Sequence, residues 1–432
     1  MNQDNNFNAQ GYDNFLNNQF SPTPSNKKAP KKFNLGLIVG AGIGIIAIGL
    51  GAFMIINNKV GTNSSGNNKS TNCKFGGELV QGAEYVNGQY TYKYKQQKSL
   101  HDGKWDNIDL DGWGVILTDK TSSEPVTTKL CTYINDKPVV SMSYMFDKSK
   151  ASTIDLSNFN TSNVVNMEWM FSATEATSLD LSKFDTKNVT NMNHMFTNSR
   201  AISLNLSNFN TSKVTDMSNM FWSSAATSIN VSSFDTSNVI NMYGMFEKTN
   251  VDDLDLKNFN TSKVVSMSQM FFESKATNIN VSSFDTSHVD SMANMFAKTE
   301  VENLNLSNFN TSNVTSMFQM FLNTKVNKLD LSNFDTSKVT DMEKMFYNSA
   351  ATTINVSSFD TRNVRNMENM FAYSNAEELD LSSFDLSTIS SSRMNGMFKS
   401  SKATKGYAKT QSDADKLNDT FYKSDELTFI IK

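Results

Sequence analysis

One interval of 25 residues governs the sequence from residue 141 to about residue 400. Phenylalanine recurs at this interval with no insertion or deletion, at Phe159, Phe184, Phe209, Phe234, Phe259, Phe284, Phe309, Phe334, Phe359 and Phe384. A unit of this length cannot bury its own apolar face and must stack on its neighbours. The sequence therefore predicts a repeat solenoid, whose function lies on a long surface rather than in one deep pocket.

The residues of one repeat predict its local structure. Residues 153–156 alternate exposed and apolar positions, which predicts a short strand that stacks in parallel on its neighbours at about 4.8 Å. Residues 160–162, Asn-Thr-Ser, have side chains suited to a turn. A short helical segment is predicted next, because apolar residues recur at three- and four-residue steps: Val164, Met167, Met170 and Phe171. The fold class is thus a solenoid of short parallel strands plus short helical segments.

The composition favours packing over chemistry. Of the 24 methionines, 22 lie in the repeated Met-x-x-Met-Phe phrase, where they are interpreted as core residues. Thioether metal sites need histidine or cysteine nearby, and the three histidines are far apart in sequence, so no cofactor or metal is predicted. A net charge of -4 with scattered lysines predicts no nucleic-acid partner. No convergent acid, base or nucleophile recurs, which predicts that the protein is not an enzyme.

The residue after each core phenylalanine shows a second period. It alternates between an amide and an acid, from Asn160 and Asp185 up to Asn310 and Asp335, which indicates duplication of a two-coil unit. Alternation keeps like charges apart in a stacked column. A calcium ladder is the alternative, although the glycine-rich nonapeptide of calcium-binding β-rolls is absent. Asn-Thr-Ser also matches a glycosylation sequon, but Asp-Thr-Ser fills the same place in alternate repeats, which favours a turn.

The N-terminal region predicts a membrane anchor. Residues 1–32 are an Asn- and Gln-rich low-complexity tail that ends in a cluster of four lysines. Residues 33–56 carry no charged side chain and are long enough for one transmembrane helix. Because the lysines precede this span, the N-terminus is predicted to be cytoplasmic and the repeat domain extracellular, in a single-pass protein of the cell membrane. A cleaved signal peptide is the alternative, although its apolar region would be shorter and no cleavage signature comes after it.

The predicted span also contains a candidate contact between membrane helices. Gly36, Gly40 and Gly44 follow each other at four-residue spacing, which is typical of helix pairs and predicts a candidate homodimer. Glycine is common in membrane helices generally, so the monomer stays open as the alternative.

Three further segments complete the predicted organisation. Residues 57–72 are a flexible linker rich in Gly, Ser and Asn, and residues 73–140 show short alternating stretches that predict a β-rich N-terminal cap. Its only cysteines, Cys73 and Cys131, are predicted to form a disulfide outside the cytoplasm, with two free thiols as the alternative. Trp105 and Trp113 are interpreted as core of this cap rather than as a ligand platform. Tandem repeats then fill 141–400, and 401–432 form a C-terminal cap.

The repeat phrase resembles a known family. Residues 329–346 read Leu-Asp-Leu-Ser-Asn-Phe-Asp-Thr-Ser-Lys-Val-Thr-Asp-Met-Glu-Lys-Met-Phe, which is similar to the tandem units of the BspA-like leucine-rich-repeat surface proteins of bacteria. The resemblance covers 141 to about 400, and residues 405–416 are similar to the segment that comes after the array in such proteins. It implies a leucine-rich-repeat-like solenoid at the cell surface, with a role in adhesion to host matrix, host cells or other bacteria. It carries over no catalytic residue. The chain has no wall-sorting motif at its end, so retention is expected to depend on the membrane segment.

Two functions are consistent with these features. The first is an adhesion module that binds a host or bacterial surface protein or glycan; the alternative is a non-specific structural spacer of the cell envelope. A binding face should vary among repeats, and the residue two before the Phe of Met-Phe does vary, from Tyr144 through Trp169 and His194 to Lys344 and Asn369. The candidate binding face consists of acids exposed along the strand column: Asp155, Asp180, Asp255, Asp330 and Asp380.

Overall fold

The computed structural model describes residues 71–98, 105–107 and 110–432. The chain divides into two compact units, Met1–Ala52 and Phe53–Lys432, and every described residue belongs to the second. The predicted tail, the membrane segment 33–56 with its glycines, and most of the linker lie outside the described ranges. Inside those ranges, no helix has the length and apolar character needed to cross a membrane.

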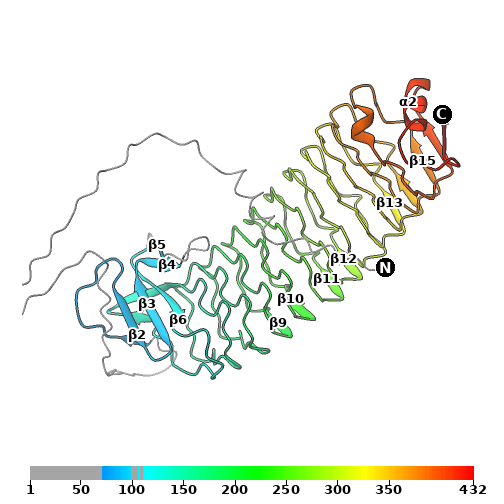
Figure 1. The fold of residues 1–432 in the computed structure, drawn as a ribbon. Coiled ribbons are helices and arrows are strands. Elements are labelled where there is room, and N and C mark those ends of the chain that lie inside the picture. The colour runs from blue at the N-terminus through cyan, green and yellow to red at the C-terminus, as the bar shows by residue number, and fades with distance from the viewer. Residues whose placement is uncertain (1–70, 99–104, 108–109) are drawn as a thin grey trace, which may run out of the picture. The chain divides into compact units, whose positions relative to one another are not determined.

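A six-stranded sheet forms the N-terminal cap (Figure 1). Its strand order is β1-β7-β8-β6-β3-β2, with antiparallel pairs β2/β3, β3/β6 and β7/β8 and parallel pairs β6/β8 and β1/β7. A separate antiparallel hairpin pairs β4 with β5. The strands are β1 (Asn72–Cys73), β2 (Glu84–Asn87), β3 (Tyr90–Tyr94), β4 (Gln96–Lys98), β5 (Trp105–Asn107), β6 (Trp113–Leu117), β7 (Tyr133–Ile134) and β8 (Lys137–Ser141).

The aromatic side chains of this cap continue the core of the repeats. Trp113 is fully buried, as predicted, and its indole N–H donates to the carbonyl of Ile134 at 3.1 Å. Tyr90 is also fully buried and its ring lies edge-on to Phe159 of the first repeat, with 6.4 Å between the ring centres. The cap therefore covers the apolar end that the first coil would otherwise expose to water. The side chain of Trp105 is outside the described part of the structure.

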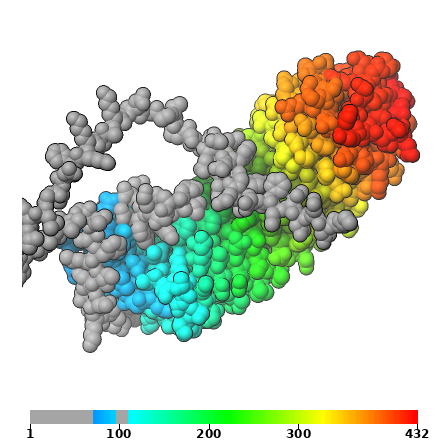
Figure 2. All heavy atoms as spheres, viewed as in Figure 1, coloured from blue at the N-terminus to red at the C-terminus, as the bar shows by residue number. Residues whose placement is uncertain are grey.

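The repeats stack as a solenoid with 25-residue coils, as predicted. Strands of neighbouring coils pair in parallel and in register, so that Leu254 lies opposite Ile279 and Leu329 opposite Ile354. A second parallel ladder of single-residue bridges runs from Ser141 to Asn366 on another side of each coil. The coil strands are β9 (Ser203–Asn205), β10 (Ser228–Asn230), β11 (Asp253–Asp255), β12 (Asn278–Asn280), β13 (Lys328–Asp330), β14 (Thr353–Asn355) and β15 (Glu378–Leu381). In Figure 2 the colour changes steadily along the array, so residues close in sequence lie close together on the surface that it shows.

The predicted helical segments are wrong. The Met-x-x-Met-Phe phrase and the two residues after it form consecutive turns, because two residues of this segment have left-handed backbone: Trp169 at φ 56° and Ala173 at φ 47° in the first full coil. Alternate N–H groups then donate locally, as from Met170 to the carbonyl of Met167 at 3.2 Å. The N–H groups between them donate to the next coil, as from Trp169 to the carbonyl of Asn193 at 3.0 Å. The turns thus join neighbouring coils, which a helix with internal hydrogen bonds would not do.

Phenylalanine and methionine fill the interior, as predicted. One ring column contains Phe159 and its equivalents, and a second contains Phe171 and its equivalents. In the second column the rings of Phe171 and Phe196 stack with 5.6 Å between centres and 6° between planes. Met167 and Met170 are fully buried, and the same holds at the equivalent positions. The core therefore extends without interruption from coil to coil.

A small C-terminal subdomain covers the last coil. Strand β15 pairs in parallel with β16 (Lys405–Ala408), which pairs in parallel with β17 (Thr428–Ile431). The short 3-10 helix η1 (Ser391–Met394) lies between β15 and β16, and the helix α2 (Gln411–Asn418) lies between β16 and β17. The ring of Phe429 packs on Phe398, 4.9 Å away, and a Cβ at Gly406 would lie only 2.3 Å from that ring. Gly406 therefore lets β17 close the core with an aromatic side chain.

Candidate functional site

The predicted acidic face forms a real column on the strand side of the coils. The in-register strands place Asp255 beside Asn280 and Asp330 beside Asn355. Each asparagine donates an amide hydrogen bond to the neighbouring acid, at 3.0 Å to Asp255 and 2.8 Å to Asp330. The acids and amides therefore form a ladder along the array. Hydrogen bonds between neighbouring coils occupy part of the acceptor capacity of the carboxylates.

Backbone N–H groups in each coil occupy a further part of the acceptor capacity of the carboxylates. One carboxylate oxygen of each candidate accepts a hydrogen bond from the backbone N–H two residues on, which fixes the turn after the strand. The distances are 2.9 Å for Asp155, 3.0 Å for Asp180, 3.3 Å for Asp255, 3.2 Å for Asp330 and 3.1 Å for Asp380. Hydrogen bonds from the residue two positions on lower the pKa of the first four carboxyls. These acids are ionised, and at least one oxygen of each has a structural role.

Two of the five acids also have lysine partners. Lys257 pairs with Asp255 at 2.6 Å, and Lys432, from beyond the array, pairs with Asp380. Partial burial opposes the charge of Asp380, but hydrogen bonds from Lys432 and Ser382 outweigh it and lower the pKa of that carboxyl. The column is thus less uniformly acidic than its sequence indicates.

A buried threonine column is the main polar feature that the sequence reading missed. The hydroxyl of Thr261 donates to the carbonyl of Asp285 in the next coil and accepts from the N–H of the same residue, both at 2.8 Å. The donation recurs in every coil from Thr161 to Thr361. Asn160 accepts from the N–H of Ser162 at 3.1 Å, which confirms the predicted turn. The signal in the sequence was the middle residue of Asn-Thr-Ser, which is threonine in all nine repeats from Thr161 to Thr361 while its neighbours change.

The variable residues two before each Phe of Met-Phe form a column whose positions share one backbone conformation. Its residues adopt left-handed φ angles between 51° and 60°, from Tyr144 at 57° to Asn369 at 56°, and glycine occupies the position at Gly244. These residues are buried or half-buried, and the aromatic rings at the start of the column stack on one another. The Trp169 ring lies parallel to Tyr144 and to His194, with centres 5.9 Å and 4.0 Å away. The variation therefore occurs within a stacked column and gives weaker support to a binding face than expected.

His194 gives this column a measurable pH dependence. Burial in the stack lowers its pKa from 6.5 to about 4. Between these two values the histidine is neutral in the folded state and protonated in the unfolded state. Stability due to this group is present above pH 6.5 and is lost as the pH falls toward 4. We expect His194→Gln to remove about 2.5 kcal/mol of the stability lost between pH 7.5 and pH 4.5, since Gln occupies the same position at Gln269 and Gln319.

Chemical unfolding at the two pH values measures this difference. The carboxyl groups titrate in both proteins and cancel in the comparison. His288→Gln, at an exposed histidine, serves as the matched control for the substitution. Parallel loss of stability in the wild type and in His194→Gln would show that the Trp169 stack does not exclude the proton.

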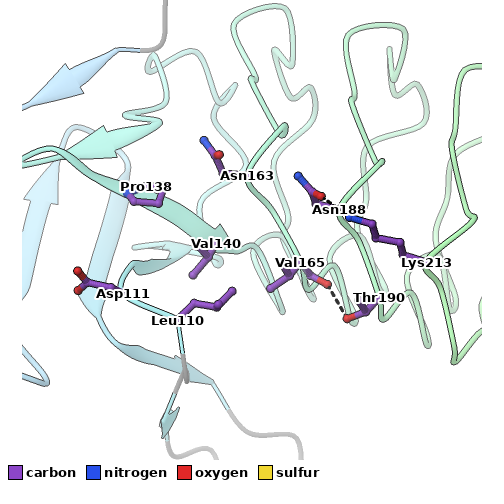
Figure 3. A pocket seen from close by; sticks show the side chains of 9 residues that line it. All are labelled: Leu110, Asp111, Pro138, Val140, Asn163, Val165, Asn188, Thr190 and Lys213. Carbon is purple, nitrogen blue, oxygen red and sulfur yellow. Dashed lines mark hydrogen bonds between the residues drawn. The ribbon is translucent and has the colours of Figure 1, made fainter.

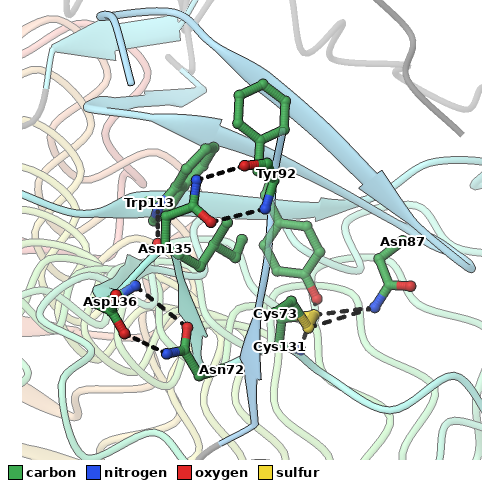
Figure 4. The surroundings of a disulfide bond; sticks show 10 residues. Asn72, Cys73, Asn87, Tyr92, Trp113, Cys131, Asn135 and Asp136 are labelled. Atoms are coloured by element: carbon green, nitrogen blue, oxygen red, sulfur yellow. Dashed lines mark hydrogen bonds between the residues drawn. A yellow bond between two sulfur atoms is a disulfide. The ribbon is translucent and has the colours of Figure 1, made fainter. Parts of the chain in front are cut away.

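The two cysteines of the cap are joined. Cys73 and Cys131 form a disulfide that links strand β1 to the segment before β7, across 58 residues (Figure 4). Both cysteines are buried, and the amide of Asn87 points at their sulfurs, at 3.0 Å from that of Cys131. The bond therefore adds a covalent link beside the pairing of β1 with β7 in the sheet that covers the array.

A shallow hollow marks the junction of cap and array (Figure 3). It has a volume of about 440 Å³ and combines apolar residues such as Leu110 and Val140 with the polar side chains of Asn188 and Lys213. Lys213 already donates to Asn188 at 2.8 Å, and Thr190 donates to the carbonyl of Val165 at 3.2 Å. Asp111 pairs with Lys137 and Asn163 donates to the hydroxyl of Tyr133, so the polar groups of this hollow have partners in the array or in the cap.

The geometry defines a class: a capped solenoid repeat protein whose polar side chains form columns along the coils. The family described as "Mycoplasma protein of unknown function, DUF285" matches residues 124–230, 198–308 and 323–427. These matches cover more than half of the chain, so the protein belongs to this repeat family. No curated protein and no solved structure matched the chain.

Proposed function

We propose that the protein is a membrane-anchored repeat protein of the bacterial cell surface that acts as an adhesion module for a protein or glycan. The observation that carries the proposal is the set of exposed side-chain columns held in register on consecutive coils, as at Asp255 beside Asn280 and Asp330 beside Asn355. Such a surface offers a long partner many weak contacts at once, and these contacts add as avidity.

Three further features support this proposal. The repeat phrase is similar to BspA-like surface proteins, the apolar run 33–56 comes after a lysine cluster, and the disulfide of the cap suits an oxidising exterior. The proposal places the N-terminus in the cytoplasm and the repeats outside. The function needs no catalytic residue.

The alternative, a structural spacer, also has an observation in its favour. Many polar side chains of the columns bond to the neighbouring coil, as Lys263 does to Asn238 at 2.6 Å and Asn348 to Asn323 at 2.8 Å. Such pairing stiffens a rod whether or not it binds anything. An adhesion assay separates the two functions.

We expect replacement of Asp255, Asp330 and Asp380 by Asn to lower adhesion to extracellular-matrix extract by about tenfold or more, because it removes three contacts of one multivalent face. Asn keeps the turn, since Asn230 and Asn355 accept the same backbone N–H in their own coils. The assay uses beads that carry the full chain.

The matched control replaces Asp235, Asp285 and Asp335, which lie in the other acidic column, by Asn. Asn310 occupies the same column in the wild type, so these changes should leave the fold and adhesion intact. Unchanged adhesion of the first variant would exclude the strand-face acids as major contacts. Wild-type beads that fail to adhere would favour the spacer.

A further inference from the structure

A charged groove is lined by residues other than those of the acidic strand face. It is an open trough of about 460 Å³ formed by four lysines and two acids: Lys248, Lys275, Lys298, Lys325, Glu273 and Glu300. Asn323 and Asn348 extend it, so its lining comes from consecutive coils between Lys248 and Asn348. An occupant that touches the whole groove must therefore be an extended chain.

Two neighbouring columns build the groove. The first contains residues with left-handed backbone at the end of the turn phrase, such as Lys248 at φ 54°, Glu273 at 56° and Lys298 at 56°. The second lies two residues further along each coil and includes Lys275 and Lys325. This arrangement repeats once per coil, so charges and amides recur along the groove.

The backbone beneath the groove is already hydrogen bonded. The N–H groups of Lys248, Glu273 and Lys298 donate to carbonyls of the next coil at 2.8, 3.0 and 2.7 Å. The N–H of Lys275 donates to the carbonyl of Thr249 at 2.9 Å. A peptide strand could not extend this ladder, since strand addition needs free backbone groups. Side chains must therefore recognise the occupant.

The charges of the groove favour an anionic occupant. Its four lysines and two glutamates, together with Glu247, which pairs with Lys248 at 3.3 Å, leave a net charge of +1 (4 - 3) in a protein of net charge -4. Glu273 pairs with Lys298 at 2.6 Å and Glu300 with Lys275 at 3.7 Å. In the described part of the chain, no ion pair involves Lys325. The groove thus has unbalanced positive charge but also carboxylates that would repel a strand of closely spaced phosphates.

The aromatic rings beside the groove argue further against nucleic acid. The ammonium of Lys248 lies 5.6 Å from the ring centres of both Trp222 and Phe272, and that of Lys298 lies 5.2 Å from Phe272. These cation–π contacts cover faces on which bases would stack. The groups that stay accessible are a mixture of ammonium, carboxylate and amide. Such a mixture matches a chain that carries both anionic groups and many hydroxyls.

We propose that the charged groove binds a linear anionic glycan, a polysaccharide that carries carboxylate or sulfate groups along its length. The lysines pair with the anionic groups, while Glu273, Glu300, Asn323 and Asn348 exchange hydrogen bonds with the hydroxyls. This inference deepens the proposed surface-binding function and rests on it for the exposure of the groove, but it uses residues that the strand face does not.

Binding of labelled oligosaccharides to the purified full chain tests the proposal. Hyaluronan fragments carry only carboxylates and heparin fragments carry sulfates as well, so the two probes distinguish the anionic group. The groove variant is Lys275→Gln, Lys298→Gln and Lys325→Gln. The matched control is Lys213→Gln, Lys263→Gln and Lys338→Gln, which makes the same charge change at lysines bonded to asparagines outside the groove.

We expect at least one glycan to bind, the groove variant to raise its Kd by about tenfold or more, and the control to change it by less than about twofold. Neutral dextran should not bind, and rising salt should weaken the interaction. Equal losses in both variants would indicate general charge attraction and overturn the proposal. Equal or tighter binding of poly-glutamate would assign the groove to an acidic peptide instead. If neither glycan binds, the groove proposal fails, while adhesion through the strand face is judged by its own assay.

Discussion

Replacing Phe259 with alanine is expected to lower the free energy of unfolding by about 3–5 kcal/mol, because it opens a cavity in a continuous buried column. Phe259 is only 2% exposed and lies in the middle of the array. Its ring stacks between those of Phe234 and Phe284, whose centres are 6.4 Å and 6.5 Å away. The neighbouring rings are held by their own coils and cannot close the gap.

Chemical unfolding followed by circular dichroism measures this loss. Val265→Ala, at an exposed apolar residue of the same coil, is the matched control and should cost less than about 1 kcal/mol. A loss below about 1 kcal/mol for Phe259→Ala would show that the phenylalanine column does not carry the contact between coils.

The sequence was sufficient to predict the solenoid and its core. The fixed interval between phenylalanines forces equivalent residues into columns, whatever the path of the chain between them. The alternation in residues such as Asp253, Leu254 and Asp255 was sufficient for the strands β9 to β15, because it leaves one apolar side chain pointing inward. The strand predicted at 153–156 was wrong in extent, since only Ile154 forms a bridge there. The parallel register of β11 on β12 results from the same repeat.

The turn phrase was mistaken for a helix for a physical reason. Inward residues at three- and four-residue steps, such as Met167, Met170 and Phe171, satisfy a helix and a chain of turns equally well. The distinguishing signal was the residue directly before the second methionine of each phrase, where Gly244 and several asparagines indicate left-handed backbone. A helical period alone does not exclude such turns.

The sequence predicted which residues form the candidate binding face, but not the hydrogen bonds and ion pairs that these residues make. The repeat alone places Asp255 and Asp330 in one column. It does not show that one oxygen of each acid holds a turn, or that Lys432 reaches back to Asp380.

Surface display is tested most directly by protease on spheroplasts, whose cell wall has been removed, that carry the full chain with a different epitope tag at each end. The proposed topology places residues 57–432 outside, where an external protease reaches them. We expect nearly complete loss of the C-terminal tag from intact spheroplasts, while the N-terminal tag stays on a short protected fragment and a cytoplasmic marker stays whole. Survival of both tags until the membrane is lysed, followed by their loss, would place the array inside and contradict a role in adhesion.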